Sequence, residues 1–437
     1  MKYMNDLLSN EGEKIMSYSR IDKLVRERMG TQSLSDASEL RNIPINIVLP
    51  SEHSHKIEIM ASCALGLSLR CFKGQVNFYC PITWSNSMLK ELLLNDATDY
   101  GESERLHFIQ GLPKGGPTLS LGFYMPGAII ADASGWIAAI NKVIPSSFSA
   151  VSPAIVFATA CAFAKIFNGY VLNDKQHLNE EWMFSLYDFR KLTSISNQIT
   201  SPSKIHIGQI ALLGAGAIGS GFSYVLSLSS WSAALEIIDY DRYNEENLET
   251  TMLIGEKEVL KKFYKADALA VLLNLHNGLK ASPIKTKITK DHLELSSYRD
   301  VLVCAVDNAQ TRRILDNANV GMIINGGVGG STEEAGHILW SRHLLNDKPL
   351  STLYNIHEES IPRTVKLNQE ISPNDISDEC SKIAYQGVSM AAPFLGLACS
   401  ALLVASCAHR AMNTFTESNY LKFDLLHIQN KNQCLCL

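Results

Sequence analysis

A glycine-rich loop between a predicted strand and a predicted helix is the strongest chemical signal in this sequence. It reads G-A-G-A-I-G over residues 214–219 and directly follows an apolar run, residues 209–213. Gly214 would allow a tight turn, Gly216 would let the backbone approach a phosphate, and Gly219 would permit close packing of the helix on the sheet. The helix amino terminus would then attract the anion. A nucleotide site is therefore predicted, and glycines used only for a tight turn are the simpler alternative.

An acidic residue and several further motifs follow the loop. Asp239 ends the next predicted strand, where a nucleotide-binding fingerprint expects an acid about 20 residues on that hydrogen-bonds a ribose hydroxyl. The residues beyond Asp239 do not look like those of a dehydrogenase. In order, they are I-D-Y-D-R-Y-N-E-E-N-L at 238–248, Lys-Ala at 265–266, V-D-N at 306–308 and Thr-Arg at 311–312.

This ordered set resembles the ThiF/MoeB superfamily, which includes the ubiquitin-activating enzymes. That family typically has a D-x-D after the second strand, an N-L-x-R-Q element, a Lys-Ala helix and an Asp-Asn at a strand end. The resemblance covers about residues 209–410. The sequence is similar to that of bacterial members that have a degenerate amino-terminal half and an active carboxyl-terminal half. Each motif alone is weak, but the set is specific because order and spacing agree.

The resemblance implies ATP and Mg²⁺ as cofactors and adenylation of a carboxylate as the reaction. Attack on the α-phosphate gathers negative charge on several oxygens, so such a site needs positioned cations and amides. Lys265 and Arg312 are the predicted cations. The alternative for Lys265 is one more solvated charge, and the alternative for Arg312 is a position on the surface. Asp307 is the predicted magnesium ligand, because it follows a central strand at the carboxyl edge of the sheet. By resemblance, further nucleotide contacts come from Asn247, Asp239, Asp241 and Asn308.

One departure from the family concerns the arginine of N-L-x-R-Q. Residues 247–251 read N-L-E-T-T, so this phosphate-binding cation is missing. Relatives often borrow an arginine from the amino-terminal helix of the partner half or subunit. Arg20 and Arg26 on the predicted helix 13–29 are the candidates, and a solvated helix face is the alternative for both.

Cysteine usage singles out one residue for a covalent step. Six of the ten cysteines lie in apolar runs, where a thiol behaves as a small buried hydrophobe. Cys380 instead lies in the polar stretch S-D-E-C-S-K, within a predicted crossover segment 343–386. Several relatives place their active cysteine in such a segment, so Cys380 is the predicted thioester cysteine, with a plain surface thiol as the alternative. No zinc is expected, because Cys434 and Cys436 form the only close pair.

By resemblance, the protein would adenylate the C-terminal glycine of a ubiquitin-like or sulfur-carrier protein. Cys380 would then accept the acyl group for transfer to a conjugating protein or a sulfur donor, and the resemblance also allows a homodimer. An NAD- or FAD-dependent oxidoreductase is one alternative, although it leaves the order of Asn247, Lys265 and Asp307 unexplained. A catalytically inactive binding scaffold with this fold is another, supported mainly by the missing arginine.

The elements that must position these residues alternate between strands and helices, which predicts an α/β fold with doubly wound, Rossmann-like sheets. Residues 1–193 form a predicted degenerate domain, 194–206 a linker, and 207–437 the active domain. The first domain has Pro-Ser-Glu at 50–52 where the second has its glycine loop. Strands are predicted, in the first domain and then in the second, at 45–49, 75–80, 118–123 and 128–131, and at 209–213, 235–239, 283–288, 301–306 and 322–325.

Composition agrees with two such domains. The chain has 437 residues, 46% of them hydrophobic, and a length prior of about 150 residues per domain gives two to three. A net charge of −5 does not favour nucleic acid binding. Cysteines spread along the chain after a polar, charged beginning favour a reducing cytoplasm. The apolar runs 151–164 and 386–408 are predicted to be buried helices that correspond between the two domains, not membrane spans.

Overall fold

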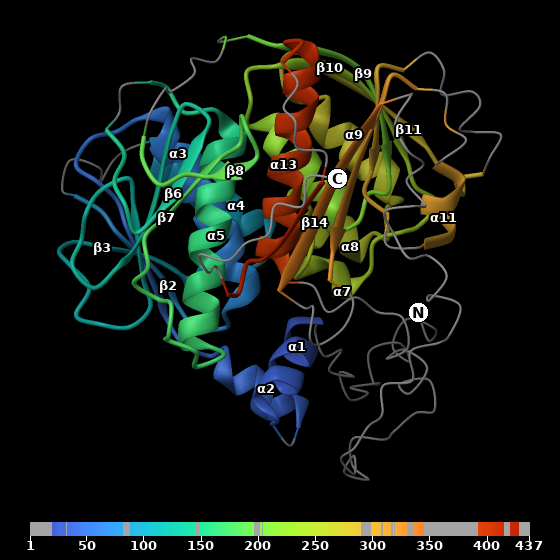
Figure 1. Ribbon diagram of the computed structural model, residues 1–437. Coiled ribbons are helices and arrows are strands. Elements are labelled where there is room, and N and C mark those ends of the chain that lie inside the picture. Colours follow the sequence, from blue (N-terminus) through green and yellow to red (C-terminus); the bar gives the residue numbers. More distant parts are fainter. Residues whose placement is uncertain are drawn as a thin grey trace, which may run out of the picture.

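The chain folds as an α/β protein with two sheets that are rich in parallel strands (Figure 1). The computed structural model describes residues 20–31, 33–81, 88–145, 148–195, 202, 204–289, 299–306, 309–315, 318, 320–329, 336–344, 392–414 and 420–427.

The first sheet has the strand order β3-β2-β1-β4-β5-β6-β7-β8. Strands β1 to β5 run parallel to one another, and β6 to β8 continue the sheet in antiparallel fashion. The strands are β1 (Ile45–Val48), β2 (Val76–Tyr79), β3 (Leu106–Ile109), β4 (Thr118–Leu121), β5 (Ile129–Ser134), β6 (Ile137–Ile140), β7 (Trp182–Ser185) and β8 (Arg190–Lys191).

The second sheet repeats this topology, with the order β11-β10-β9-β12-β13-β14-β15. Its first five strands in chain order are parallel and its last two are antiparallel, as in the first sheet. Each strand of the second sheet therefore has a counterpart among β1 to β7. The strands are β9 (His206–Leu213), β10 (Ser232–Ile238), β11 (Leu279–Ile284), β12 (Val301–Cys304), β13 (Met322–Val328), β14 (His337–Leu344) and β15 (Tyr420–Asp424).

The helices also fall into two sets along the chain. With the first sheet go α1 (Arg20–Met29), α2 (Leu34–Leu40), α3 (His55–Cys71), α4 (Met88–Asp99), the 3₁₀ turn η2 (Ser103–Arg105) and α5 (Ser152–Tyr170). With the second go α6 (Ala217–Ser227), α7 (Glu245–Leu248), α8 (Glu256–Leu260), α9 (Lys265–Leu273), α11 (Ala309–Ile314) and α13 (Pro393–Ala411).

Two long apolar helices, α5 and α13, pack against each other between the sheets (Figure 1). Each carries a proline in its first turn, where the missing N–H costs nothing. Both are long and apolar enough to cross a membrane by length and composition, yet 100% and 89% of their most apolar windows are buried inside the protein. The rings of Phe167 on α5 and Phe394 on α13 lie 5.5 Å apart. The prediction of two corresponding buried helices is confirmed, although residues 386–391 lie outside the described part.

Most predicted strands agree with the structure to within a few residues. The strand predicted at 283–288 is wrong, because β11 begins at Leu279 and ends at Ile284. Pro283 therefore lies inside this strand and does not begin it. β11 is at the edge of its sheet, where a residue without an N–H is tolerated. The predicted helix 13–29 is described only from Arg20 onward.

Candidate nucleotide site

The glycine loop joins β9 to α6, as its sequence predicted. Gly214 has a φ of +90°, a conformation that favours glycine, and its N–H donates to the carbonyl of Ile238 on β10. A Cβ on Gly219 would overlap the carbonyl oxygen of Gly214, whereas a Cβ on Gly216 would meet nothing within 4 Å. The loop therefore has a tight turn, an open position and a close helix contact, which are the three features that phosphate binding requires.

Asp239 fastens this loop to the end of β10. Its carboxylate accepts hydrogen bonds from the N–H groups of Ala215, at 2.7 Å, and Asp241, at 2.8 Å. The buried Tyr243 hydroxyl donates to the carbonyl of Ala215 at 3.1 Å. Burial raises the pKa of Asp239, and the two backbone hydrogen bonds partly offset that effect. The acid predicted to bind a ribose thus also shapes the loop, and its spare lone pairs leave room for a hydroxyl.

Lys265 lies at the same rim. Its ammonium group is 3.4 Å from the carboxylate of Asp241, and its side chain is only 13% exposed. The side chain is therefore not fully solvated, and its contact with a nucleotide stays a prediction. Asn247 is buried in α7, where its side-chain oxygen accepts from the N–H of Asn244 and caps the helix.

Arg312 belongs to the carboxyl edge of the second sheet. Its guanidinium donates to the carbonyls of Val306, at 2.8 Å, and Gly326, at 3.3 Å, so a free surface position is wrong for it. Asp307, Asn308 and Cys380 lie outside the described residues, and their roles stay predictions. Within the described ranges, no group of three His, Cys, Asp or Glu side chains is arranged to hold a metal ion.

The cysteines in apolar runs are buried, as predicted. Burial raises the pKa of the Cys71 and Cys399 thiols to about 12. Cys80 is half-buried, and burial raises its pKa to about 11. A thiolate is the nucleophilic form of cysteine, so these thiols are poor acyl acceptors near neutral pH.

Helix α1 of the first half reaches the second half beside the incomplete N-L-x-R-Q element. The Arg20 Nε atom is 3.7 Å from a carboxylate oxygen of Glu246 in α7. Arg26 lies in the last turn of the same helix, about 9 Å along its axis from Arg20. The structure thus brings the predicted Arg20 to Glu246, the residue just before the motif whose arginine is missing.

Sequence reasoning missed two other arginines of the first half, Arg41 and Arg70. Arg41 is almost completely buried and contacts Asp22 of α1 at 2.8 Å and Glu249 of the second half at 3.4 Å. Arg70, in the last turn of α3, donates to the carbonyls of Thr251 and Ile254. Arg41 and Glu249 are 208 residues apart in sequence, and Arg70 and Thr251 are 181 residues apart, so no local pattern signals these contacts.

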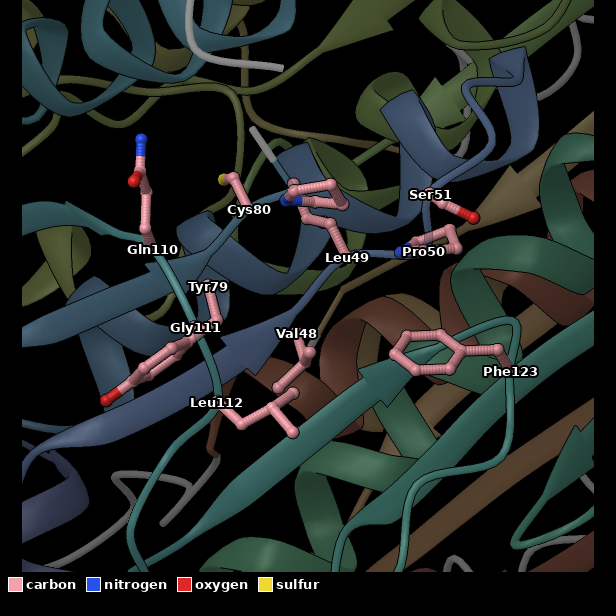
Figure 2. Close-up of a pocket in the computed structure, with 11 residues that line it drawn as sticks. Val48, Leu49, Pro50, Ser51, Tyr79, Cys80, Gln110, Gly111, Leu112 and Phe123 are labelled. Carbon is pink, nitrogen blue, oxygen red and sulfur yellow. The ribbon is translucent and has the colours of Figure 1, made fainter. Parts of the chain in front are cut away.

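The first sheet has a cavity at the place that corresponds to the glycine loop. Its volume is about 460 Å³, and it lies at the carboxyl ends of β1, β2 and β3. Val48 and Leu112 point toward one another there, and Phe123 approaches from the segment after β4 (Figure 2). The chain after β1 continues with Leu49, Pro50 and Ser51, so no glycine loop lines this cavity, which is mostly apolar.

These features define a two-sheet α/β protein in which a strand, a glycine loop and a helix follow one another in the second half. A family model described as the BilD C-terminal domain matches residues 208–414, just under half of the chain, and this stretch includes the glycine loop, Asp239 and Lys265. No curated protein matches the chain.

A comparison with solved structures matches, among others, E. coli MccB with ATP and the microcin C7 biosynthetic enzyme MccB with N-formylated MccA. Their identities to this chain are 16% and 15%, with TM-scores of 0.37 and 0.38. PaaA has 12% identity and a TM-score of 0.36. The alignments cover 52% of this chain in each case and 61%, 62% and 62% of those structures, which is less than two thirds of their length.

Proposed function

We propose that this protein uses ATP to activate the C-terminal carboxylate of a ubiquitin-like or sulfur-carrier protein by adenylation. The observation that carries the proposal is the joined set of the glycine loop, Asp239 and Lys265 on one rim of the second sheet. The proposal also relies on the ordered motifs of the sequence, which resemble the ThiF/MoeB superfamily.

In this reaction a carboxylate oxygen of the carrier attacks the α-phosphorus of ATP, and the bond to the departing pyrophosphate breaks. The N–H groups at the start of α6 and the ammonium of Lys265 would stabilise the negative charge that gathers on the phosphate oxygens. Asp239 would hold the ribose and keep the loop in shape. Asp307 would hold Mg²⁺, which would supply further neutralisation of the phosphate charge.

A second step would form a thioester. The thiolate of Cys380 would attack the carbonyl carbon of the acyl-adenylate, forming a carbon–sulfur bond and releasing AMP. The acyl group would then pass to a conjugating protein or a sulfur donor. We also infer that the first half binds no nucleotide, because its corresponding cavity lacks a glycine loop.

Pyrophosphate exchange tests the first step. The purified chain, ATP, magnesium and a panel of small ubiquitin-like proteins ending in glycine should exchange labelled pyrophosphate into ATP for at least one of these proteins. Lys265→Ala should reduce the exchange rate at least about 100-fold, as loss of one charge-stabilising donor commonly does. Lys261→Ala is the matched control from the same basic run, since Lys261 is exposed. Absence of exchange with every carrier, together with no ATP binding, would favour the inactive scaffold.

A labelled carrier tests the second step. A covalent adduct should appear on a non-reducing gel, disappear with thiol reductant, and be lost in Cys380→Ala. If the adduct persists in Cys380→Ala, the nucleophile is another residue, even though adenylation itself stands.

A further inference from the structure

Arg70 connects the first half to the segment that follows the incomplete N-L-x-R-Q element. Its Nε and Nη2 atoms donate to the carbonyl oxygens of Thr251, at 2.8 Å, and Ile254, at 3.2 Å. Its Nη1 donates to Gly66 within its own helix at 3.0 Å, and its guanidinium stacks 3.9 Å from the ring centroid of Tyr100. Arg70 is 4% exposed, so water cannot replace these bonds easily.

The segment that Arg70 holds is itself bonded to the nucleotide site. The N–H of Met252 donates to the Ser220 hydroxyl at 3.3 Å, and Ser220 directly follows Gly219 in α6. The Thr251 hydroxyl donates to the carbonyl of Asn247 at 2.6 Å. A short chain of hydrogen bonds therefore runs from Arg70 to the helix that begins at the glycine loop.

Arg41 strengthens the same connection. Its Nε donates to the carbonyl of Cys71 at 2.9 Å, and its Nη2 donates to the carbonyl of Arg70, which fixes the end of α3. Its Nη1 contacts Asp22 and Glu249, so α1, α3 and the motif segment meet at one buried guanidinium. Nearby charges from Glu249 and Asp22 raise the pKa of Arg41 against the opposing effect of burial.

We propose that Arg70 is a positioning residue for the nucleotide site of the other half. It holds residues 250–254 in place and thereby orients α7, with Asn247, and the start of α6. Through Arg70, the first half thus controls nucleotide affinity, although Arg70 itself does not touch the nucleotide. The expected effect on ATP affinity rests on the proposed function. The expected effect on the order of residues 250–254 does not.

Arg105 offers a matched control. It is another largely buried arginine, and its guanidinium donates to the carbonyls of Leu69, Phe72 and Gly74 at the same end of α3. These bonds stay within the first half. Replacing Arg105 should therefore loosen the end of α3 as replacing Arg70 does, while leaving the bonds to Thr251 and Ile254 in place.

The experiment compares the full-length wild type with Arg70→Met, Arg70→Lys and Arg105→Met. Methionine keeps much of the packing against Tyr100 but removes the donors, and lysine keeps the charge with a single donating group. ATP affinity in magnesium is measured by calorimetry, and hydrogen exchange is followed for peptides that cover 247–254. Wild-type exchange is recorded without nucleotide, so the structural comparison needs no activity.

We expect Arg70→Met to bind ATP about tenfold more weakly, which corresponds to about 1.4 kcal/mol. Its peptides covering 247–254 should exchange hydrogen faster than those of the wild type. Arg70→Lys should lie between the wild type and Arg70→Met in both measurements, and Arg105→Met should bind ATP within about twofold of wild type. Unchanged exchange at 247–254 in Arg70→Met, or unchanged ATP affinity, would overturn the positioning role. If Arg70→Met does not fold, Arg70→Lys against Arg105→Met decides by the same two measurements. A wild type that binds no ATP would overturn the proposed function, and the exchange comparison would then decide alone whether Arg70 orders the segment.

Discussion

The contact between Phe394 and Phe167 is the place to test whether the two halves share one core. Phe394 is fully buried at the start of α13, and its ring lies 5.5 Å from that of Phe167 on α5. We predict that Phe394→Ala lowers the free energy of unfolding by about 3–5 kcal/mol, the range for removing a fully buried phenylalanine. About 0.5–1.5 kcal/mol of that loss should come from the aromatic pair itself.

A double-mutant cycle with Phe167→Ala separates these contributions. Urea unfolding of the wild type, both single variants and the double variant should give a coupling energy of about 0.5–1.5 kcal/mol, because the rings touch across the two halves. Leu275→Ala is the control, since Leu275 is 75% exposed and its loss should change stability by less than about 0.5 kcal/mol.

Two results would refute this reasoning. A loss below about 1 kcal/mol for Phe394→Ala would mean that the helix pair carries little of the packing energy. Circular dichroism and tryptophan fluorescence could instead show separate unfolding transitions for the two halves, with Phe394→Ala shifting only the transition of the second half. That result would mean that the halves do not unfold as one unit.

Three further outcomes are expected. Gly219→Ala should abolish measurable ATP binding by calorimetry and lower the melting temperature, because its Cβ would overlap the carbonyl oxygen of Gly214, and unchanged binding would refute the loop geometry. Thr250→Arg, which restores the family arginine, should destabilise the chain by about 3–5 kcal/mol in urea unfolding instead of improving ATP affinity, because Thr250 is 2% exposed and a buried unpaired charge is costly. The hydrogen bond with Asp424 raises the pKa of His427 in the folded protein. The pair of His427 and Asp424 therefore stabilises the fold fully below the unfolded-state histidine pKa of about 6.5, and this stabilisation is lost as pH rises through the higher pKa of the folded state. His427→Gln should remove this part of the pH dependence of the melting temperature, and an unchanged profile would count against the pair.

The alternation of strands and helices could be predicted because most parallel strands are short apolar runs bounded by turn residues. The parallel strand β3, which reads L-H-F-I, was not predicted. The antiparallel strands that complete each sheet, such as β6 and β14, were not predicted. β6 reads I-A-A-I and is buried at every position, so it lacks the alternation of apolar and polar residues that marks a half-buried strand. β11 was misplaced because Pro283 suggests a strand boundary, while its edge position removes that restriction.

The candidate nucleotide rim could be located in the sequence for a different reason. The glycines, Asp239 and Lys265 lie next to strand and helix ends, so their spacing along the chain reflects their positions in the fold. Arg70 carries no such signal, since in sequence it is one basic residue at the end of an apolar helix. Its importance depends on carbonyl groups 181 and 184 residues away, which become neighbours only when the two halves pack together.

The repeated sheet topology has a consequence for how this protein responds to dilution. In an assembly of two separate copies, a contact such as that of Arg70 with the neighbouring half would weaken as the protein concentration falls. Here both halves belong to one chain, and a covalent link keeps their effective concentration in about the millimolar range or above. The specific activity of the proposed adenylation should therefore stay constant from micromolar to nanomolar protein, even at levels too low to support pairing of separate chains.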